Sequence, residues 1–156
     1  MDYVQMGPED YAPFHELACA YYREGEDADT PQEEMDAFIA SLFEMVRSHE
    51  IEGCFARIGE KTIGFALWAV DAEGFRFSEM PGFGTILEIG LAKDYRASGL
   101  GKAFVAHIER AFLEKDITRC YVSAYGPAQT FWARCGYREN GKKASNGLPM
   151  MVKELH

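Results

Sequence analysis

The sequence has few of the residues from which metal sites and disulfide frameworks are built. Its 156 residues contain 4 cysteines and 4 histidines, and no two cysteines form a Cys-x-x-Cys pair. Closely spaced cysteines are typical of zinc sites and of small secreted scaffolds, so neither is indicated. We therefore expect no metal site, and we expect Cys19, Cys54, Cys120 and Cys135 to be small core residues.

The sequence also lacks a long apolar run. The longest, residues 63–70, is too short to cross a bilayer, and no basic-then-apolar segment opens the chain. We therefore expect a cytoplasmic location and no membrane partner. The net charge of −9 argues against a nucleic-acid partner, because nucleic acids attract basic surfaces.

What is present is the composition of a globular protein. The sequence is 47% hydrophobic and 26% charged, which excludes disorder as its main character. A chain of this length is able to bury one substantial core. We therefore predict a single domain over residues 1–156.

The charge is unevenly distributed along the chain. Residues 1–60 hold 15 acids and 3 bases, a net charge of −12, whereas residues 61–156 hold 10 acids and 13 bases, a net charge of +3. Seven acids and no base lie between Glu24 and Asp36. This segment is either a solvated loop and helix start, with Thr30 as the N-cap and Pro31 just inside the helix, or the rim of a site for a cation.

Hydrophobic periodicity predicts an α+β fold. Apolar residues at three- and four-residue steps indicate helices, and short apolar runs between turn signals indicate strands. Gly59 and the two residues after it are typical of a hairpin turn. The helices are expected at residues 9–22, 31–46, 101–115 and 127–134, and the strands at residues 3–6, 54–58, 62–70, 85–91, 118–124, 137–138 and 149–155. Residues 71–84 are predicted to be a loop and a candidate substrate wall, and residues 141–147 a basic connection.

The strand at residues 85–91 is followed by a basic turn with two glycines and then directly by a helix. Glycine lets the backbone come close to a ligand. The first N–H groups of a helix and its dipole favour an anion. The sequence therefore predicts an anion-binding turn at residues 96–102.

Two common phosphate-binding motifs do not fit this turn. A nucleotide P-loop needs a glycine where Arg96 stands and a serine or threonine where Ala103 stands. A dinucleotide-binding turn needs a small residue in place of Phe104 and an acid near Cys120. The pattern that remains is Arg96-x-x-Gly99-x-Gly101.

This pattern resembles the acyl-CoA pyrophosphate loop of the GNAT superfamily of N-acetyltransferases. A second stretch, Ala128-x-x-Phe131-Trp132-x-x-Cys135-Gly136-Tyr137, is similar to another motif of that family. The resemblance covers roughly residues 85–140. It implies a mixed, mostly antiparallel sheet of six to seven strands, splayed at the CoA site and flanked by about four helices. It also implies acceptor-side helices over residues 1–50 and an acyl-CoA-binding core over residues 85–140.

By resemblance, backbone N–H groups from Ala97 to Lys102 hold the pyrophosphate of acetyl-CoA, and Leu91 and Lys93 frame the pantetheine arm. Lys93, Arg96 and Lys102 add positive charge there. Trp132 stands where many members have a tyrosine near the coenzyme sulfur. The expected coenzyme-binding residues are Leu91, Ala92, Lys93, Arg96, Ala97, Ser98, Gly99, Leu100, Gly101, Lys102 and Trp132.

The catalytic groups are less well specified by the motifs. An indole N–H is far too weak an acid to protonate a thiolate, so Trp132 does not replace the usual tyrosine as general acid. Either a hydroxyl such as that of Tyr125 or Tyr137 takes the role, or the thiolate leaves unassisted, which we favour because its pKa is low. Glu88, an acid in an apolar strand, is the candidate base, although strand alternation could instead place it in solvent.

The resemblance implies an enzyme that moves acetyl from acetyl-CoA directly to a primary amine. The acidic N-terminal part favours a cationic acceptor, either a small molecule or a peptide. The alternative is a non-catalytic acyl-CoA-binding or sensing domain, suggested by Trp132. The sequence leaves the oligomeric state open, a homodimer included.

Overall fold

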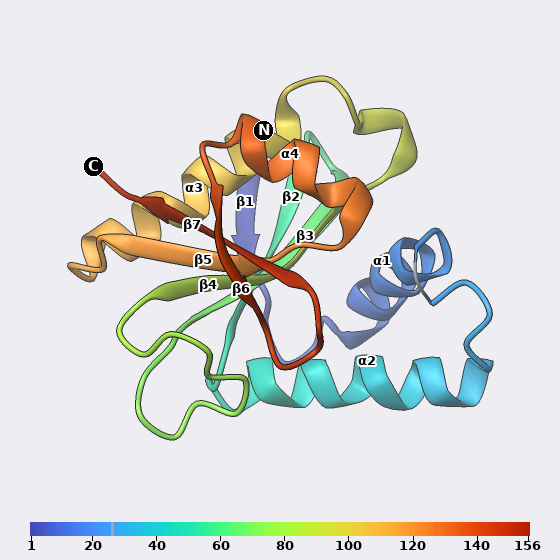
Figure 1. Cartoon of the computed structure of the whole chain (residues 1–156). Helices are drawn as coiled ribbons and strands as arrows, with labels where there is room; N and C mark the ends of the chain where they lie inside the picture. The colour runs from blue at the N-terminus through green and yellow to red at the C-terminus, as the bar shows by residue number, and fades with distance from the viewer. Residues whose placement is uncertain (26) are drawn as a thin grey trace. The chain divides into compact units, whose positions relative to one another are not determined.

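The computed structural model describes residues 1–25 and 27–156 and divides into two compact units (Figure 1). The first unit comprises residues 1–67 and 88–101, and the second comprises residues 68–87 and 102–156. Strands β3 (Lys61–Val70) and β4 (Gly84–Leu91) each begin in one unit and end in the other. That the chain acts as a single domain stays a prediction.

The strands form one mixed sheet in the order β1-β2-β3-β4-β5-β7-β6. With four α-helices and two short 3₁₀ turns among the described residues, this confirms the predicted α+β class. The strands and helices not yet given are β1 (Asp2–Gln5), β2 (Glu52–Ile58), β5 (Arg119–Ser123), β6 (Arg138–Lys143), β7 (Pro149–Glu154), α1 (Tyr11–Arg23), α2 (Gln32–Arg47), α3 (Leu100–Glu114) and α4 (Gln129–Arg134).

In the first unit, β1 pairs antiparallel with β2, with Val4 opposite Phe55. Strands β2 and β3 are neighbours joined only by Gly59 and Glu60, and Gly59 has a φ of 61°. A two-residue connection between neighbouring strands can join only antiparallel strands, and positive φ is what its tight turn needs. The predicted hairpin is thereby confirmed.

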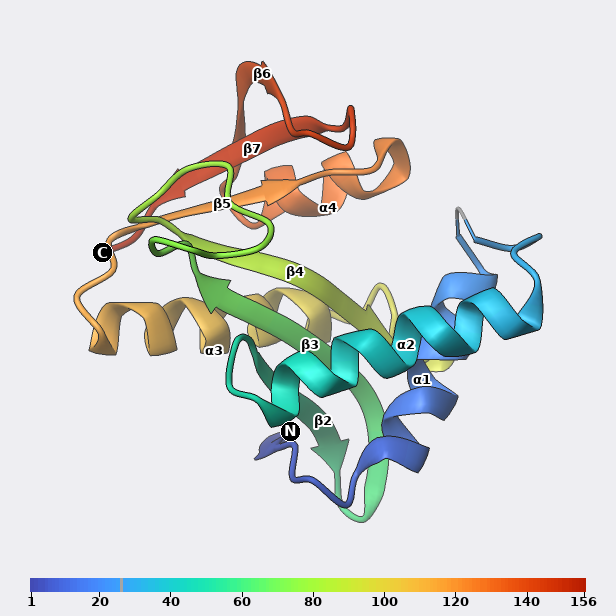
Figure 2. The ribbon, with the colours of Figure 1, turned by 90° about the horizontal axis from the view of Figure 1, so that it is seen from below.

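Helices α1 and α2 lie side by side in the first unit (Figure 2). Their apolar faces follow the predicted periodicity, and Phe14 of α1 is fully buried. Its ring centroid lies 5.7 Å from that of Phe43 on α2 and 5.5 Å from that of Phe65 on β3. Because burying a phenylalanine is worth about 1.5–3 kcal/mol, this cluster fixes both helices to the strands.

The start of α2 differs by one residue from the prediction. Pro31 is the N-cap, with an extended ψ of 142°, and the helix begins at Gln32. The Thr30 hydroxyl donates to Asp27 at 3.4 Å instead of capping the helix. The Thr30 carbonyl accepts a hydrogen bond from Arg23, so both polar groups of Thr30 serve the connection between α1 and α2.

In the second unit, β4 and β5 are parallel, with Gly84 opposite Cys120 and Thr85 opposite Tyr121. Helix α3 is the connection, because parallel neighbours need a crossover. The predicted β-α-β crossover is therefore confirmed. These two registered pairs lie near the beginnings of both strands, and the predicted splay beyond them stays a prediction.

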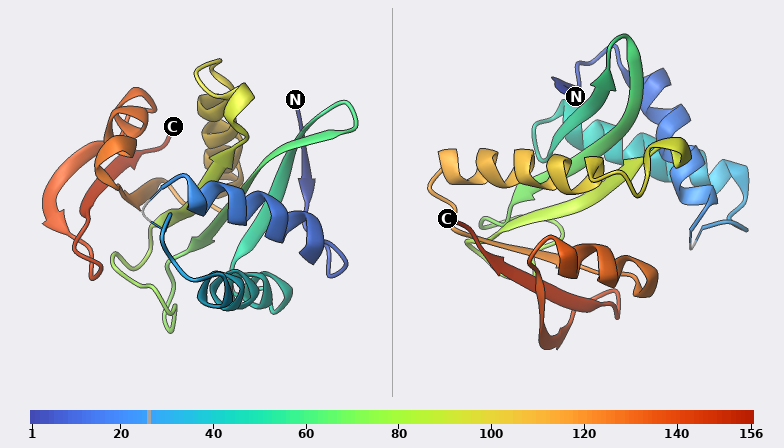
Figure 3. Two further views of the ribbon diagram at one scale, coloured as in Figure 1. Left: turned by 90° about the vertical axis from the view of Figure 1, so that its right-hand side faces the viewer. Right: turned by 90° about the horizontal axis from the view of Figure 1, so that it is seen from above.

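The other strands of the second unit are antiparallel: β7 pairs with both β5 and β6 (Figure 3). The predicted connection over residues 141–147 is wrong in part, since β6 extends to Lys143 and Lys143 pairs with Pro149. A tight turn over Ala144 to Leu148 makes the reversal, with Gly147 at a φ of 84°.

No helix in the described part of the chain is long and apolar enough to cross a membrane.

Candidate functional site

The turn after β4 has the backbone conformation of an anion cradle. A 3₁₀ turn at Lys93–Tyr95 follows the strand, then Ala97 and Gly99 have φ angles of 60° and 82°, and α3 begins at Leu100. Left-handed φ favours glycine, and a Cβ placed on Gly99 would meet no heavy atom within 4 Å. The Gly99 face of the turn is therefore open for a ligand to approach.

Helix α3 supplies hydrogen-bond donors at the end of this turn. The N–H groups at the start of an α-helix have no partners inside the helix, and in α3 these include the N–H groups of Leu100, Gly101 and Lys102. The dipole of a 15-residue helix adds partial positive charge at the same end. Both features fit a phosphate group, so the residues present fit the pyrophosphate of a coenzyme A molecule.

The side chains of the turn differ in how available they are. Lys93, Ser98 and Lys102 are exposed. Arg96 is also exposed, but its Nη2 forms an ion pair with Glu24, the C-cap of α1, and its Nε donates to the Leu91 carbonyl at 2.9 Å. Its positive charge is therefore partly neutralised, unlike that of the two lysines.

Two groups near the turn were not identified from the sequence. Glu24 is one, since nothing in the order of residues links the end of α1 to the turn. Lys61 is the other: its Nζ lies 5.2 Å from the centre of the Tyr95 ring, within reach of a cation–π interaction. Both contacts join segments more than 30 positions apart along the chain.

The first unit contains a small pocket of about 50 Å³ beside this turn. It is lined by α1, β3 and the end of β4, and three predicted coenzyme-binding residues, Leu91, Ala92 and Arg96, take part in its wall. Its volume suits a few water molecules or a small group. The structure thus places Leu91, Ala92 and Arg96 together with Glu24.

Gly90 keeps the elements around this pocket close together. A Cβ on Gly90 would lie 2.6 Å from the Tyr21 ring and 3.1 Å from the Phe65 ring. No side chain larger than hydrogen fits there without a shift of α1 or β3. Gly90 therefore lets α1 lie close to the end of β4.

Glu88, the candidate base, lies on β4 and is half-buried. The nearby Tyr22 on α1 is buried, and this burial, followed by the negative charge of Glu88, raises the pKa of Tyr22 well above its usual value. The structure therefore places Glu88 next to the last turn of α1, where it is neither deeply buried nor fully solvated.

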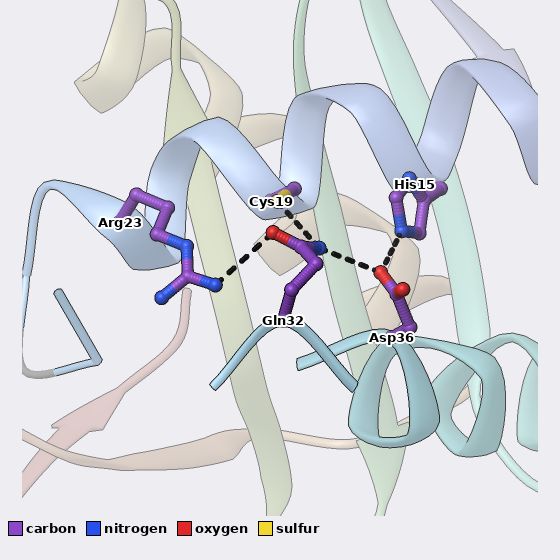
Figure 4. Close-up of polar contacts among 5 residues, drawn as sticks. All are labelled: His15, Cys19, Arg23, Gln32 and Asp36. Carbon is purple, nitrogen blue, oxygen red and sulfur yellow. Dashed lines mark hydrogen bonds and ion pairs between the residues drawn. The ribbon is translucent and has the colours of Figure 1, made fainter. Parts of the chain in front are cut away.

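A chain of polar contacts joins α1 and α2 (Figure 4). His15 Nε2 lies 2.6 Å from Asp36 Oδ1, which also accepts a hydrogen bond from Gln32 at 2.7 Å. These two hydrogen bonds lower the pKa of Asp36. Arg23 donates to Gln32 at 3.1 Å and to three backbone carbonyls of the connection, those of Asp27, Ala28 and Thr30. These contacts fix the position of α2 against α1.

The acids of the segment between Glu24 and Asp36 differ in exposure. Glu24, Asp29, Glu33 and Glu34 are exposed, whereas Asp27 and Asp36 are half-buried. Glu26, the remaining acid of the seven, lies outside the described residues. The exposed carboxylates give this part of the first unit a negative surface.

The remaining predicted site residues belong to the second unit. Tyr125 is 41% exposed and comes directly before a 3₁₀ turn at Gly126–Ala128. Trp132 is only 6% exposed, and its ring packs edge-on against Phe131 and Tyr137, with centroids 5.1 Å apart in each case. Tyr125 therefore remains accessible to a ligand, while Trp132 can offer a ligand little more than an edge.

Tyr137, the other hydroxyl considered as general acid, is a structural group. It is 1% exposed, and its hydroxyl donates to Glu109 at 2.9 Å. Lys153 donates to the other Glu109 oxygen at 2.8 Å. Burial, together with Cys120 and Glu109, raises the pKa of Tyr137 far above its usual value, so this hydroxyl keeps its proton.

The loop over residues 71–83 is tied down by a second buried network. Asp71 is fully buried, and its Oδ2 accepts from the Tyr121 hydroxyl at 2.8 Å and from the backbone N–H groups of Glu79 and Met80 at 2.9 Å. Burial alone would raise the pKa of Asp71, but hydrogen bonds from Ser78, Tyr121 and the two N–H groups outweigh it and lower that pKa. The beginning of the predicted substrate wall is thereby hydrogen-bonded to residues 79 and 80 near its end.

The cysteines are as expected in three cases. Cys54, Cys120 and Cys135 are buried, and Cys19 is half-buried. Burial raises the pKa of Cys54 and Cys120 to about 12 and that of Cys135 to about 11. In the described residues, no group of three or more acids, histidines and cysteines could hold a metal ion.

The chain is similar to one known protein family and to many solved structures. Residues 11–137 match the acetyltransferase (GNAT) family. No curated protein sequence matches the chain. Many solved structures share the fold, including PaiA N-acetyltransferase from Thermoplasma acidophilum in complex with coenzyme A, which is 15% identical, covers 98% of both chains and has a TM-score of 0.74.

Two further structures extend the likeness. An acetyltransferase from Thermus thermophilus is 15% identical, covers 99% of this chain and 96% of its own, and has a TM-score of 0.75. Aminoglycoside acetyltransferase AAC(6')-Ib, in complex with coenzyme A, is 20% identical, covers 98% of this chain and 95% of its own, and has a TM-score of 0.71. At these identities the structures show the shared fold. The family match over residues 11–137, together with the fold and the turn after β4, shows that this chain belongs to the GNAT family of acetyl-CoA-dependent acetyltransferases.

Proposed function

We propose that the chain transfers the acetyl group of acetyl-CoA directly to a primary amine of a cationic small molecule or peptide. The proposal that the chain binds acetyl-CoA rests on one observation, the turn with left-handed Ala97 and Gly99 directly before α3. The proposal that the acceptor is cationic rests on the exposed carboxylates of the first unit and on the net charge of −12 over residues 1–60. When bound, acetyl-CoA supplies the thioester carbonyl that the amine attacks.

In this proposal the backbone N–H groups of residues 97–102 bind the pyrophosphate, and Lys93 and Lys102 add charge from the side. Leu91, Ala92 and Trp132 are assigned apolar contacts with the rest of the coenzyme. The assignments within the turn follow the family motif and are supported by the exposure of the turn, whereas that of Trp132 follows the motif alone. Arg96 is assigned to the same loop, although Glu24 shares its charge.

Glu88 is proposed to take the proton from the acceptor ammonium, because an amine attacks only when its lone pair is free. The half-buried position of Glu88, beside Tyr22, supports this role. Tyr125 is the remaining hydroxyl proposed to protonate the departing thiolate, and it is exposed. A thiolate with a pKa of about 8.5 also leaves without help, so loss of Tyr125 should affect the rate less than loss of Glu88.

The coenzyme site is tested by Gly99→Glu. An added carboxylate in the cradle repels the pyrophosphate, and we expect CoA affinity measured by calorimetry to fall about 100-fold or more. Gly147→Glu is the matched control, because Gly147 has a φ of 84° and open space at its Cβ, as Gly99 does. Equal CoA affinity in the two variants would contradict the assignment.

The acceptor class is tested by measuring thiol release from acetyl-CoA across a panel of cationic and neutral amines. We expect cationic amines to have the higher kcat/KM, and Glu33→Gln to lower that preference while Glu60→Gln, an exposed acid in the β2–β3 turn, leaves it unchanged. No preference across the panel would rule out a cationic acceptor. CoA binding without amine-dependent thiol release would instead support the sensing domain suggested by Trp132.

A further inference from the structure

The last turn of α1 is fastened to the proposed coenzyme loop through one residue. Glu24 forms an ion pair with Arg96, the first residue of the motif. Arg96 also donates from Nε to the Leu91 carbonyl at the end of β4, at 2.9 Å. The Arg96 guanidinium therefore joins α1, β4 and the loop, using two of its five N–H donors.

The position of this anchor matters because of the residue that follows it. Ala97 has a φ of 60°, a left-handed conformation that costs an L-residue with a side chain about 1–2 kcal/mol. Such a conformation persists only where the surrounding structure imposes it. The ion pair fixes the residue directly before Ala97, so it restrains the loop where the loop is most strained.

The Glu24–Arg96 pair contributes little to stability. Both side chains are 42% exposed, and exposed ion pairs are typically worth about 0–1 kcal/mol. Its removal should therefore leave the fold intact. Removal of the pair instead changes the conformational freedom of the proposed coenzyme loop and the charge around that loop.

The same turn of α1 also reaches the candidate base. Tyr22 lies beside Glu88, and Glu24 lies two residues later against Arg96. Glu24 and Arg96 both line the small pocket, together with Tyr21 and Leu91. The C-terminal end of α1, with its C-cap Glu24, thus lies beside both the proposed proton acceptor and the proposed coenzyme loop.

We propose that Glu24 is a positioning residue for coenzyme binding: it holds Arg96 so that the strained loop keeps the conformation that receives the pyrophosphate. This proposal rests on the coenzyme site assigned above. Arg96 then acts as an anchor of the loop, and the backbone and the two lysines bind the phosphates. A loop that is ordered before binding has less entropy to lose when the coenzyme binds.

The experiment is a double-mutant cycle on CoA affinity, measured by calorimetry with the wild type, Glu24→Gln, Arg96→Gln and the double variant. We expect each single variant to weaken CoA binding about 5- to 10-fold and the double variant to be no weaker than either. In steady-state assays the KM for acetyl-CoA should rise while kcat changes little. Glu24→Asp, which keeps the charge, should recover part of the loss.

Glu16→Gln is the matched control, because Glu16 is exposed on the same helix and the charge change is the same. We expect its CoA affinity and melting temperature to equal those of the wild type. Melting temperatures of the Glu24 and Arg96 variants should also stay close to that of the wild type, which separates loop positioning from loss of folding.

Three outcomes overturn the proposal. Unchanged CoA affinity in Glu24→Gln shows that the pair does not position the loop. Tighter binding shows that Glu24 competes with phosphate for Arg96, which makes Arg96 a direct ligand. Additive losses in the double variant show that the two residues act separately. If Gly99→Glu binds CoA with full affinity, the assigned coenzyme site itself is wrong. If Gly99→Glu loses CoA affinity but Glu24→Gln does not, only the positioning role of Glu24 is contradicted.

Discussion

The two units use the same kinds of charged and hydroxyl side chains in opposite ways. In the second unit, Asp71 and Glu109 are buried; Asp71 accepts from a tyrosine and two backbone donors on Oδ2, and Glu109 accepts from a tyrosine and a lysine. In the first unit, the pairs Glu24–Arg96 and His15–Asp36 are exposed in large part. A buried carboxylate stabilises the fold through its partners, whereas an exposed one stays free to meet a ligand. Burial, more than residue type, separates the enclosed charges of the second unit from the solvent-accessible charges of the first.

The largest expected effect is on stability, in the second unit. Asp71→Ala would leave the Tyr121 hydroxyl and two backbone N–H groups buried without an acceptor. We expect the free energy of unfolding to fall by about 3 kcal/mol or more, measured in urea. Glu73→Ala, an exposed acid in the same loop, is the control and should change it by less than about 0.5 kcal/mol. A loss no larger than that of the control would break the comparison.

The contribution of the Asp71 carboxylate to stability should depend on pH. The pKa of Asp71 is lower in the folded protein than the ordinary value of about 3.9, because its hydrogen bonds favour the ionised form. Its contribution to stability is therefore fully present above that ordinary pKa and is lost as pH falls through the lowered one. The stability difference between the wild type and Asp71→Asn should shrink in that range, and a constant difference would contradict the assignment.

A smaller effect, on activity, is expected in the first unit. Tyr22→Phe keeps the buried ring and removes only the hydroxyl beside Glu88. We expect the unfolding free energy to change by less than about 1 kcal/mol and kcat/KM to fall several-fold, as measured by thiol release. Tyr11→Phe, which removes a hydroxyl from the same helix, is the control. A change in stability without a change in kcat/KM would place Tyr22 with the structural residues.

The smallest effect concerns thiol reactivity and does not alter the fold. The thiolate is the reactive form, and burial keeps Cys54, Cys120 and Cys135 protonated. Labelling of the native protein near pH 8 with a thiol reagent should therefore modify Cys19 first and the other three only after unfolding. Rapid labelling of all four would show that the cores of both units open readily.

The sequence predicted most of the elements because their signals are local. The apolar periodicity of α1 and α2, the turn at Gly59 and the strand-turn-helix order around Gly99 each depend on neighbours within a few residues. The prediction failed at two element ends, where a polar contact seven residues apart and a strand pairing six residues apart, neither visible in the apolar pattern, set the boundary. The Thr30 carbonyl is used by Arg23, so Pro31 becomes the cap, and the pairing of Lys143 with Pro149 extends β6.

The candidate site divides in the same way. The sequence predicted the turn before α3, because backbone conformation there follows from glycine spacing and from the start of a helix. The polar partners of that loop could not be read from the sequence. Glu24 stands 72 positions before Arg96, and Glu109 stands 28 before Tyr137; only folding brings these pairs together.

By itself, then, the sequence determined the α+β class and the family, and it proposed the coenzyme turn, since each is carried by short patterns. The tertiary structure decided which charges are available. It engages Tyr137 with Glu109, buries Trp132, leaves Tyr125 exposed and sets Glu88 beside Tyr22. Availability depends on burial and on partners from distant segments, and neither is encoded in the spacing of neighbouring residues.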